Sequence, residues 1–289
     1  MSRTALITVG ELAAHLQDPD WRIIDCRFSL ADTDAGYRAY AAGHIPGAIY
    51  ADLDRDLSGP ITESSGRHPL PEREQLRQRL GGWGIAAQTR VVVYDDAGGA
   101  FAARLWWLLR WMGHEAVGIL DGGFPAWLAA DRPVDSAEPH YARRDFPERP
   151  PLAQWLSAEQ VLSGLASGDM LLVDARAAPR FEGTEEPLDP VAGHVPGALN
   201  RPYQDNLSDD GRFLPSPQLR EQFQALIAAH PPAQVVHMCG SGVTACHNLF
   251  AMELAGLSGA GLYAGSWSEW IRDPARPVAG PGAKANVLS

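Results

Sequence analysis

The sequence contains an internal repeat, and this repeat constrains the fold more than any other feature. Gly-His-Ile-Pro-Gly-Ala at residues 43–48 returns as Gly-His-Val-Pro-Gly-Ala at residues 193–198. Three further pairs of segments match in the same order along the chain: 23–25 with 171–174, 91–94 with 235–238, and 122–127 with 265–270. The repeat predicts two similar domains. A length of 289 residues agrees, because a single core stops growing near ~250 to 300 residues.

Each copy alternates short apolar runs with longer segments of helical spacing. Residues 91–94 and 235–238 are segments of strand length, whereas 100–111 and 243–255 have the spacing of helices. This alternation predicts an α/β fold in which parallel strands are joined by helices on both faces of each sheet. A segment rich in proline and charge separates the copies. The predicted domains are therefore residues 1–138 and 153–289, with a linker at 139–152.

Composition and charge exclude several classes of function. The formal net charge is −11, and no cluster of Lys and Arg is dense enough to neutralise a run of phosphates, so nucleic acid is not an expected partner. No stretch approaches the ~20 apolar residues of a membrane-spanning helix, and the N-terminal residues lack a secretory pattern. We therefore expect a cytoplasmic protein with no membrane partner.

The three cysteines predict thiol chemistry at one position. They are too few for a disulfide framework and match no metal-binding spacing, so no metal is expected to bind them. Cys26 and Cys246 are expected to be structural, because a lone cysteine usually behaves as a small buried hydrophobic residue. Cys239 differs, because a strand, a glycine-rich loop and the start of a helix coincide on it.

The loop that follows Cys239 has the composition of an anion-binding site. Gly240 and Gly242 allow the backbone to turn tightly before a helix that is predicted to begin at Val243. The N–H groups of residues 240–244 then point towards the sulfur, where they stabilise a thiolate or a persulfide. Ligands also bind at the carboxyl ends of strands in parallel α/β sheets, which is where the sequence places Cys239.

Three motifs together resemble one known family. They are Cys-Gly-Ser-Gly-Val-Thr at 239–244, the repeated Gly-His-x-Pro-Gly-Ala, and Asp-Ala-Arg at 174–176 before Arg-Phe-Glu-Gly at 180–183. The chain resembles the tandem-domain thiosulfate and 3-mercaptopyruvate sulfurtransferases of the rhodanese superfamily over nearly its whole length. The resemblance implies two rhodanese-like domains and a reaction that needs no cofactor and no metal. It also implies that Cys239 takes a sulfane sulfur from a small donor as a persulfide and passes it to a thiol such as thioredoxin, or to cyanide.

The resemblance implies roles for individual residues. Arg180 matches the donor-binding arginine of the family, and a proton relay of the mercaptopyruvate enzymes is matched by Ser241, His68 and Asp54. In the family the amino-terminal copy has lost the cysteine, and here Asp95 stands opposite Cys239, so the first domain is expected to be non-catalytic. The loop residues expected to hold the negative sulfur of the donor are Gly240, Gly242, Val243 and Thr244.

Two features point to different sulfur donors. The loop carries Gly240 and Ser241 where thiosulfate-preferring members have basic residues, which favours 3-mercaptopyruvate. The mercaptopyruvate enzymes, however, carry a second arginine where this chain has Leu188, and leucine cannot pair with a carboxylate. Arg176 is expected to pair structurally with an acid, and neither His44 nor His194 is assigned to catalysis.

Two other functions share parts of this pattern. Cysteine phosphatases and arsenate reductases also present a thiolate after a strand, but they need an arginine six residues after the cysteine, where this chain has Ala245. Non-catalytic rhodanese modules that serve binding or regulation usually lack the cysteine, which the second copy retains as Cys239. Sulfur transfer is therefore the favoured function.

Overall fold

The chain folds into two compact units, each of which contains a short segment from the other half of the sequence. A computed structural model describes residues 5–281. The first unit holds the described residues up to Gly59, together with Leu70–Ala153 and Leu207–Phe213. The second unit holds Pro60–Pro69, Gln154–Asn206 and the described residues from Leu214 onwards. The segment Pro60–Pro69 therefore belongs spatially to the second unit, although it lies in the first sequence repeat.

The first sheet consists of five parallel strands. They are β1 (Leu6–Ile7), β2 (Trp21–Asp25), β3 (Ala48–Tyr50), β4 (Arg90–Tyr94) and β5 (Val117–Leu120). Their spatial order is β1-β5-β4-β2-β3, which places β4 at the centre. All of β4 is buried, as expected for a strand that is covered on both faces. The register pairs Val92 with Ile23 on one side and with Gly118 on the other.

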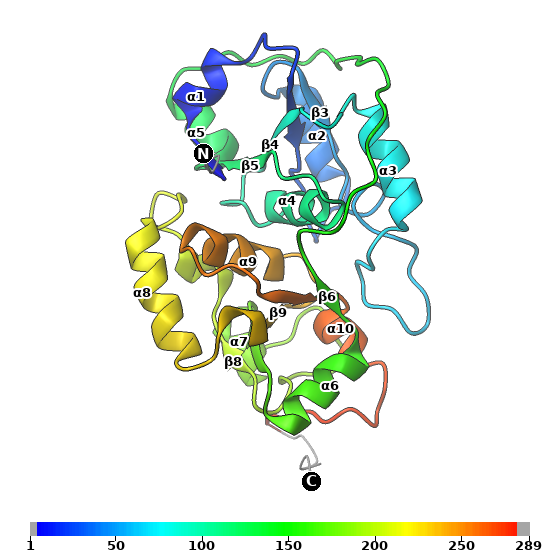
Figure 1. Cartoon of the computed structure of the whole chain (residues 1–289), viewed down its shortest axis with the longest axis vertical. Helices are drawn as coiled ribbons and strands as arrows, with labels where there is room; N and C mark the ends of the chain where they lie inside the picture. The colour runs from blue at the N-terminus through cyan, green and yellow to red at the C-terminus, as the bar shows by residue number, and fades with distance from the viewer. Residues whose placement is uncertain (1–4, 282–289) are drawn as a thin grey trace. The chain divides into compact units, whose positions relative to one another are not determined.

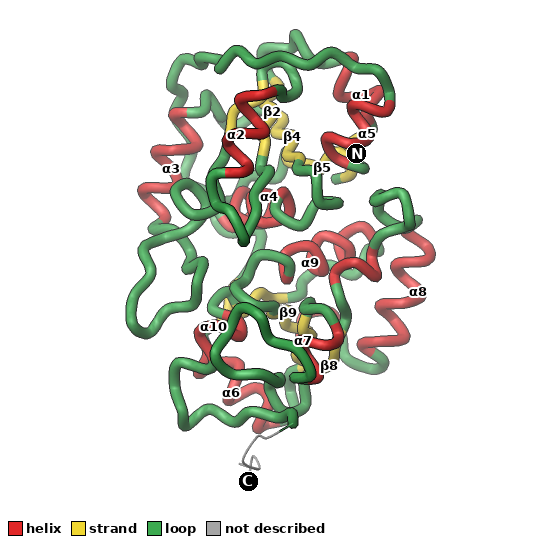
Figure 2. The backbone as a smooth tube through the Cα atoms, turned by 180° about the vertical axis from the view of Figure 1, so that it is seen from behind, coloured by secondary structure: helices red, strands yellow, loops and turns green. Residues whose placement is uncertain are grey.

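Five helices cover the two faces of this sheet (Figures 1 and 2). They are α1 (Val9–Ala14), α2 (Ala35–Ala42), α3 (Arg73–Gly82), α4 (Ala102–Trp111) and α5 (Gly123–Ala129). α1 and α5 lie on one face, where Leu12 and Trp127 share a core with Val92 of β4. α1 begins after Thr8 because the Thr8 Oγ1 accepts the Glu11 N–H at 3.1 Å.

The second sheet repeats the topology of the first. Its parallel strands are β6 (Trp155–Leu156), β7 (Leu171–Asp174), β8 (Leu199–Asn200), β9 (Val235–Met238) and β10 (Gly261–Tyr263). Their order, β6-β10-β9-β7-β8, is that of the first sheet with each strand replaced by its repeat partner. The predicted α/β fold with two parallel sheets is confirmed.

The second unit contains five α-helices and two short 3-10 helices. They are α6 (Ala158–Ser167), α7 (Ala178–Glu182), η1 (Tyr203–Asn206), α8 (Ser216–Ile227), η2 (Pro232–Gln234), α9 (Ala245–Leu254) and α10 (Ser266–Trp270). α6 begins with a capping box in which the Ser157 Oγ accepts the Gln160 N–H and the Gln160 side chain accepts the Ser157 N–H.

Both helices that follow a central strand begin two residues later than predicted. α4 begins at Ala102 rather than at residue 100, and α9 begins at Ala245 rather than at Val243. Gly242 explains the later start of α9. Its φ is +76°, and a β-carbon there would collide with the carbonyl oxygen of Ala264. The turn at Gly242 therefore keeps residues 240–244 in a loop.

The repeated histidines have a structural part, as predicted. His44 Nδ1 lies 2.9 Å from the carbonyl oxygen of Tyr40, and His194 Nδ1 lies 2.8 Å from that of Phe181. Each imidazole also stacks on the ring of the same partner, with centroids 4.0 Å apart. These contacts hold the end of α2 and of α7 to the following Gly-His-x-Pro-Gly-Ala turn.

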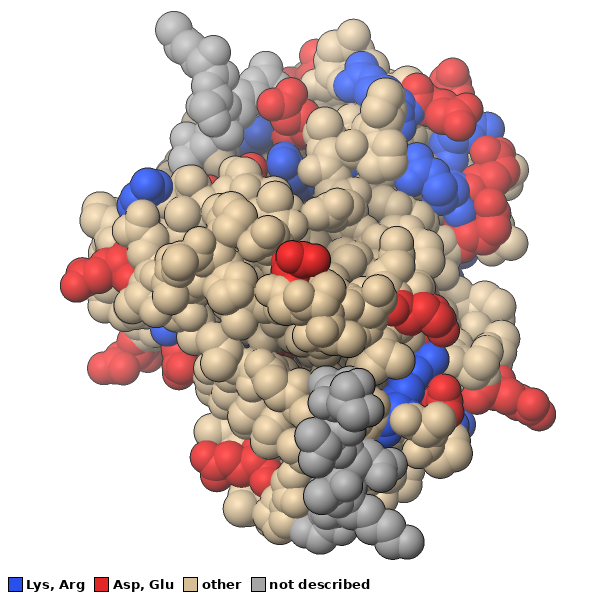
Figure 3. Space-filling view, turned by 60° about the horizontal axis from the view of Figure 1, so that its bottom comes forward, with Lys and Arg blue, Asp and Glu red and all other residues tan. Residues whose placement is uncertain are grey.

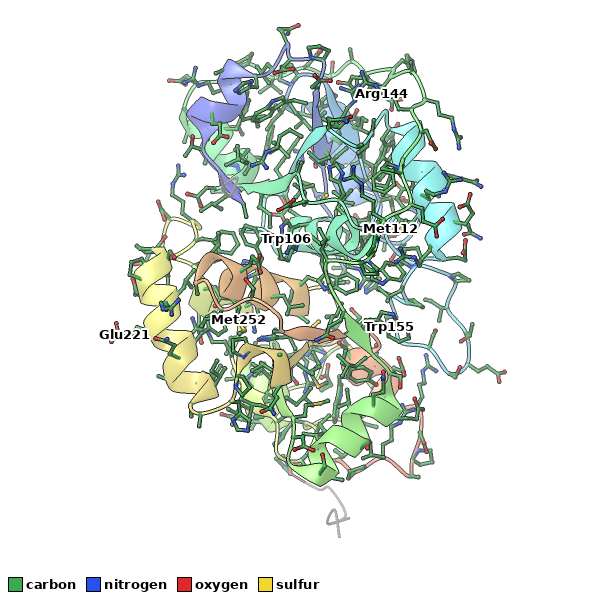
Figure 4. The ribbon with its side chains drawn as sticks, viewed as in Figure 1. Trp106, Met112, Arg144, Trp155, Glu221 and Met252 are labelled. Carbon is green, nitrogen blue, oxygen red and sulfur yellow. The ribbon has the colours of Figure 1, made fainter. Side chains whose placement is uncertain are left out.

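The segment predicted as a linker contains no helix or strand between residues 136 and 154. It packs on the first unit, because Phe146 is buried and the Arg144 N–H donates to the Gly81 carbonyl at 2.9 Å (Figure 4).

Within residues 5–281 no helix is long and apolar enough to cross a membrane. On the face drawn in Figure 3, basic side chains lie beside acidic ones and form no continuous basic patch.

Candidate active site

Cys239 lies at the carboxyl end of β9, the central strand of the second sheet. All four residues of β9 are buried, and Cys239 itself is 2% exposed. The start of α10 fixes its backbone on both sides. The Cys239 N–H donates to the Ser266 Oγ at 3.0 Å, and the Cys239 carbonyl accepts the Trp267 N–H at 3.0 Å. The sequence prediction therefore agrees with the structure on where this thiol sits.

Ser266 is held in a strained conformation beside the cysteine. Its φ is +54°, a region that residues other than glycine rarely adopt, and the first copy has Gly123 there with a φ of +56°. The buried Ser266 hydroxyl donates to the Tyr263 carbonyl at 2.9 Å while it accepts the Cys239 N–H. These two hydrogen bonds hold the conformation and fix the position of the Cys239 backbone.

His68 and Ser241 are brought together within the second unit. The His68 Nδ1 lies 2.7 Å from the Ser241 Oγ, and both side chains are buried. The segment that carries His68 is anchored by Gly66, where a β-carbon would lie 2.5 Å from the Gly265 carbonyl oxygen. The two predicted relay members therefore belong to one compact unit, although they are 173 positions apart in the sequence.

Arg180 lies beside the loop, and its guanidinium is paired with a buried carboxylate. A β-carbon at Gly240 would be 3.5 Å from the Arg180 Nη1. The Arg180 Nε and Nη2 donate to the Glu186 Oε1 at 3.0 and 2.8 Å. Burial alone would raise the pKa of Glu186, but hydrogen bonds from Arg180 and from the Leu188 and Asp189 N–H groups hold the pKa below its ordinary value.

Arg67 lies on the same side of the loop. A β-carbon at Gly240 would be 2.9 Å from the Arg67 Nη2, closer than it would be to Arg180. Arg67 pairs with Asp189, whose second oxygen accepts the Arg180 Nη2 at 3.1 Å. Burial raises the pKa of Asp189, and its near neighbour Arg67 opposes that rise. The loop is therefore flanked by two guanidinium groups that share one carboxylate.

Arg176 makes the structural ion pair predicted for it. Its Nη2 donates to the Asp174 Oδ2 at 2.7 Å and to the Gly193 carbonyl at 2.8 Å. Its guanidinium also lies over the Trp267 ring, 4.6 Å from the centroid. The first copy repeats this ion pair between Arg27 and Asp25. The contact therefore belongs to the fold and has no part in catalysis.

Asp95 occupies the position in the first unit that Cys239 holds in the second. It follows β4, and its carbonyl accepts the Phe124 N–H at 2.8 Å, as the Cys239 carbonyl accepts that of Trp267. The fully buried carboxylate accepts four backbone N–H groups at 2.8 to 2.9 Å, which belong to Ala97, Gly99, Phe101 and Ala102. Burial raises the pKa of Asp95, and these four hydrogen bonds oppose the rise. The loop of the first copy is thus filled by its own anion.

The remaining predicted residues lie in three different surroundings. Asp54 lies in a turn of the first unit, where partial desolvation and neighbouring Asp52 raise its pKa. Leu188 is exposed. Cys26 is buried, which raises the pKa of its thiol, and the Cys246 Sγ donates to the Gly242 carbonyl at 3.3 Å. Among residues 5–281 no group of three or more His, Cys, Asp or Glu could hold a metal ion.

Three site residues were not identified from the sequence. Ser266 could have been found from the repeat, because it replaces a glycine at a matched position. Arg67 and Asp189 gave no local signal, since each stands in a polar, proline-flanked segment that is typical of a solvated loop. Their partnership depends on Pro60–Pro69 packing on the second unit.

The chain is similar to known proteins over most of its length. The rhodanese-like domain family matches residues 8–130 and 157–273. A probable 3-mercaptopyruvate sulfurtransferase of Pseudomonas aeruginosa is 50% identical over 96% of this chain and 99% of that protein. A putative thiosulfate sulfurtransferase of Mycobacterium tuberculosis is 41% identical over 94% of this chain and 96% of that protein. The structure of the 3-mercaptopyruvate sulfurtransferase from Leishmania major is 34% identical, with a TM-score of 0.80, over 92% of this chain and 74% of that one.

Proposed function

Because this chain belongs to the rhodanese-like family of sulfurtransferases, as its motifs predicted, we propose that Cys239 carries the transferred sulfur as a persulfide. The observation that supports this assignment is the position of Cys239 at the end of the central strand, in a loop flanked by Arg180 and Arg67. We further propose 3-mercaptopyruvate as the preferred donor over thiosulfate, because the first residues after the cysteine, Gly240 and Ser241, carry no charge.

In the first half-reaction the Cys239 thiolate attacks the sulfur of 3-mercaptopyruvate. A sulfur–sulfur bond forms, and the carbon–sulfur bond of the donor breaks, leaving its electron pair on the methylene carbon. The proton of the donor thiol ends on that carbon, which makes the product pyruvate. The enzyme keeps a negatively charged persulfide on Cys239. The N–H groups of loop residues Gly240, Gly242, Val243 and Thr244 stabilise this charge, so the step needs no metal.

His68 and Ser241 move the proton in this step. Their 2.7 Å separation allows a proton to pass between the hydroxyl and the imidazole, and Ser241 lies two residues after Cys239 in the same loop. Asp54 remains the predicted third member, which would orient the imidazole. Thiosulfate brings no proton, because its outer sulfur is transferred with sulfite as the leaving group.

In the second half-reaction a nucleophile removes the outer sulfur. We propose a thiol such as that of thioredoxin, or cyanide, as this acceptor, and the cytoplasm as the compartment. The cytoplasm keeps thiols reduced, which agrees with three cysteines that form no disulfide. The first unit carries no sulfur itself, because the Asp95 carboxylate cannot accept a sulfane sulfur and already fills its loop.

The persulfide assignment is tested by mass spectrometry of the intact protein after treatment with 3-mercaptopyruvate. We expect one added sulfur, located on Cys239 by peptide mapping and removed by cyanide. Cys239→Ala should abolish turnover, while Cys26→Ala and Cys246→Ala should retain it, because both of those thiols serve the packing. Sulfur on either of the other two cysteines, or turnover by Cys239→Ala, would overturn the proposal. The ratio of kcat/KM for the two donors tests the donor preference.

A further inference from the structure

Two arginine side chains reach the loop after Cys239, and the sequence motifs account for only one of them. The Arg67 Nη2 would lie 2.9 Å from a β-carbon at Gly240, whereas the Arg180 Nη1 would lie 3.5 Å from it. We propose that Arg67 is a second donor-binding residue, which holds the carboxylate of the sulfur donor together with Arg180. This inference rests on the function proposed above.

The backbone around Arg67 is held firmly in place. The Arg67 N–H donates to the Ser268 Oγ at 3.0 Å. At the preceding residue, Gly66, a β-carbon would lie 2.5 Å from the Gly265 carbonyl oxygen and 2.9 Å from that Oγ, so the segment packs directly against the start of α10. The Arg67 side chain is 27% exposed. It is therefore positioned by its backbone and still accessible to a small ligand.

Asp189 keeps the two guanidinium groups side by side. One of its oxygens accepts from Arg67, and the other accepts the Arg180 Nη2 at 3.1 Å. The Asp189 side chain is 4% exposed, so its carboxylate is shielded from water, whereas both guanidinium groups remain partly exposed. The two arginines are pre-arranged at the loop before any donor arrives, which lowers the entropic cost of binding.

The charges at this position favour a donor with one negative charge over a donor with two. Arg67 and Arg180 bring two positive charges, and Asp189 and Glu186 bring two negative charges. 3-Mercaptopyruvate adds one carboxylate, whose two oxygens match the fork of a guanidinium. The cluster is already balanced, so every added negative charge has a desolvation cost, and thiosulfate adds two such charges where 3-mercaptopyruvate adds one.

Arg67 also explains how this chain functions with Leu188. The resemblance implies a second arginine at that position, and the leucine is exposed and apolar. Arg67 brings the missing guanidinium from another segment, Pro60–Pro69, which packs on the same unit. The second positive charge is therefore retained but comes from a different part of the sequence.

The first experiment compares steady-state kinetics of Arg67→Gln with those of the wild type. We expect KM for 3-mercaptopyruvate to rise about 10- to 100-fold, the loss expected for a charged hydrogen bond, with kcat within about threefold. Arg220→Gln is the matched control in the same unit, because its guanidinium donates to the Ala255 carbonyl at the end of α9. Its KM should stay at the wild-type value. An unchanged KM in Arg67→Gln overturns the inference.

A double variant separates donor binding from simple neutralisation of Asp189. If Arg67 only balances that buried charge, Asp189→Asn should restore the KM of Arg67→Gln to the wild-type value, and this result would overturn the inference. If Arg67 binds the donor, the raised KM should persist in the double variant. Should Arg67→Gln fail to fold, Arg67→Lys can replace it. This variant keeps the positive charge but loses the two parallel N–H donors of the guanidinium, so its KM for 3-mercaptopyruvate should still rise.

Binding of 3-hydroxypyruvate distinguishes this inference from the proposed function. This probe has the same carboxylate and no sulfur, and its Kd for the Cys239→Ala protein is measurable by calorimetry. We expect the added Arg67→Gln change to weaken the Kd by the same factor as it raises KM. If the wild type forms no persulfide, the proposed function fails. If the wild type forms it and Arg67→Gln leaves both constants unchanged, only the present inference fails.

Discussion

Individual residues around Cys239 divide into those that hold the thiol and those that handle the donor. Ser266 fixes the Cys239 backbone by accepting its N–H, at the cost of a φ of +54°. His68 and Ser241 form a hydrogen-bonding pair whose chemistry depends on the donor. We expect the first contact to be needed for any sulfur donor, and the second only where a proton must move.

His68→Ala should therefore affect the two donors unequally. We expect kcat for 3-mercaptopyruvate to fall by about 10² to 10⁴, the usual contribution of a general acid or base. Thiosulfate turnover should fall much less, because its half-reaction moves no proton. Both rates are measured on the same preparation, with the heat stability of the variant as the control for folding. Small and equal losses for both donors would show that His68 only lines the site.

Sequence reasoning at the residue scale succeeded where the position of a residue follows from local backbone. Cys239, Gly240 and Gly242 were predicted because strand, turn and helix start are adjacent in the sequence. Arg67 and Asp189 were missed because their roles depend on a segment 122 positions away packing on the same unit. No local pattern records such a contact.

At the scale of single elements, β9 and the helices around it contain a buried base. His237 is fully buried in β9, and its Nε2 lies 3.0 Å from the Met252 sulfur on α9 (Figure 4). In the part of the chain that the structure describes, its Nδ1 has no hydrogen-bond partner. Burial lowers the pKa of His237 to about 3. The strand therefore holds the neutral imidazole at any physiological pH.

This buried histidine predicts acid sensitivity. Its folded pKa lies below the ordinary value near 6.5, so from about pH 6.5 down to about pH 3 the unfolded chain binds a proton that the folded chain does not. The free energy of unfolding should fall with decreasing pH across that window, by up to about 1.4 kcal/mol per pH unit from this residue.

Urea unfolding at several pH values measures this effect. His237→Leu should show a shallower fall in the free energy of unfolding below pH 6.5 than the wild type. His114, whose pKa burial lowers to about 4, contributes a similar fall in both proteins and so cancels in the comparison. Equal slopes in the two proteins would contradict the prediction.

Element boundaries were predicted well except where tertiary contacts decide them. Hydrophobic runs placed β4 and β9 correctly, because central strands are buried on both faces. α9 began two residues later than its spacing suggested, since the turn at Gly242, with its φ of +76°, packs closely against the Ala264 backbone, and the local sequence does not show this contact.

At the scale of the whole molecule, the sequence repeat and the spatial units are not the same division. Pro60–Pro69 belongs to the second unit and Leu207–Phe213 to the first. The repeat predicted two α/β domains correctly, but a repeat cannot show where a loop from one copy packs. The second half of the sequence alone thus lacks part of the site.

Separate expression of the halves tests this division. We expect residues 154–289 alone to turn over 3-mercaptopyruvate at least about 10² times more slowly than the whole chain, because this fragment lacks Arg67 and His68. Residues 1–138 should show no sulfur transfer, because Asp95 stands where the nucleophile would be. If residues 154–289 alone were about as active as the whole chain, the role of Pro60–Pro69 would be contradicted. If residues 1–138 turned over the donor, the first domain would not be non-catalytic.

The Asp95 carboxylate, enclosed by four backbone N–H groups, makes the two halves of this duplicated chain thermodynamically unequal. A ligand stabilises only the state that binds it, by an amount that grows with the logarithm of its concentration. In the first unit the anion is part of the chain, so its contribution to stability is constant. In the second unit the corresponding anion arrives with each turnover and leaves with the acceptor. The resistance of the second unit to unfolding should therefore follow the availability of sulfur donor, whereas that of the first should not.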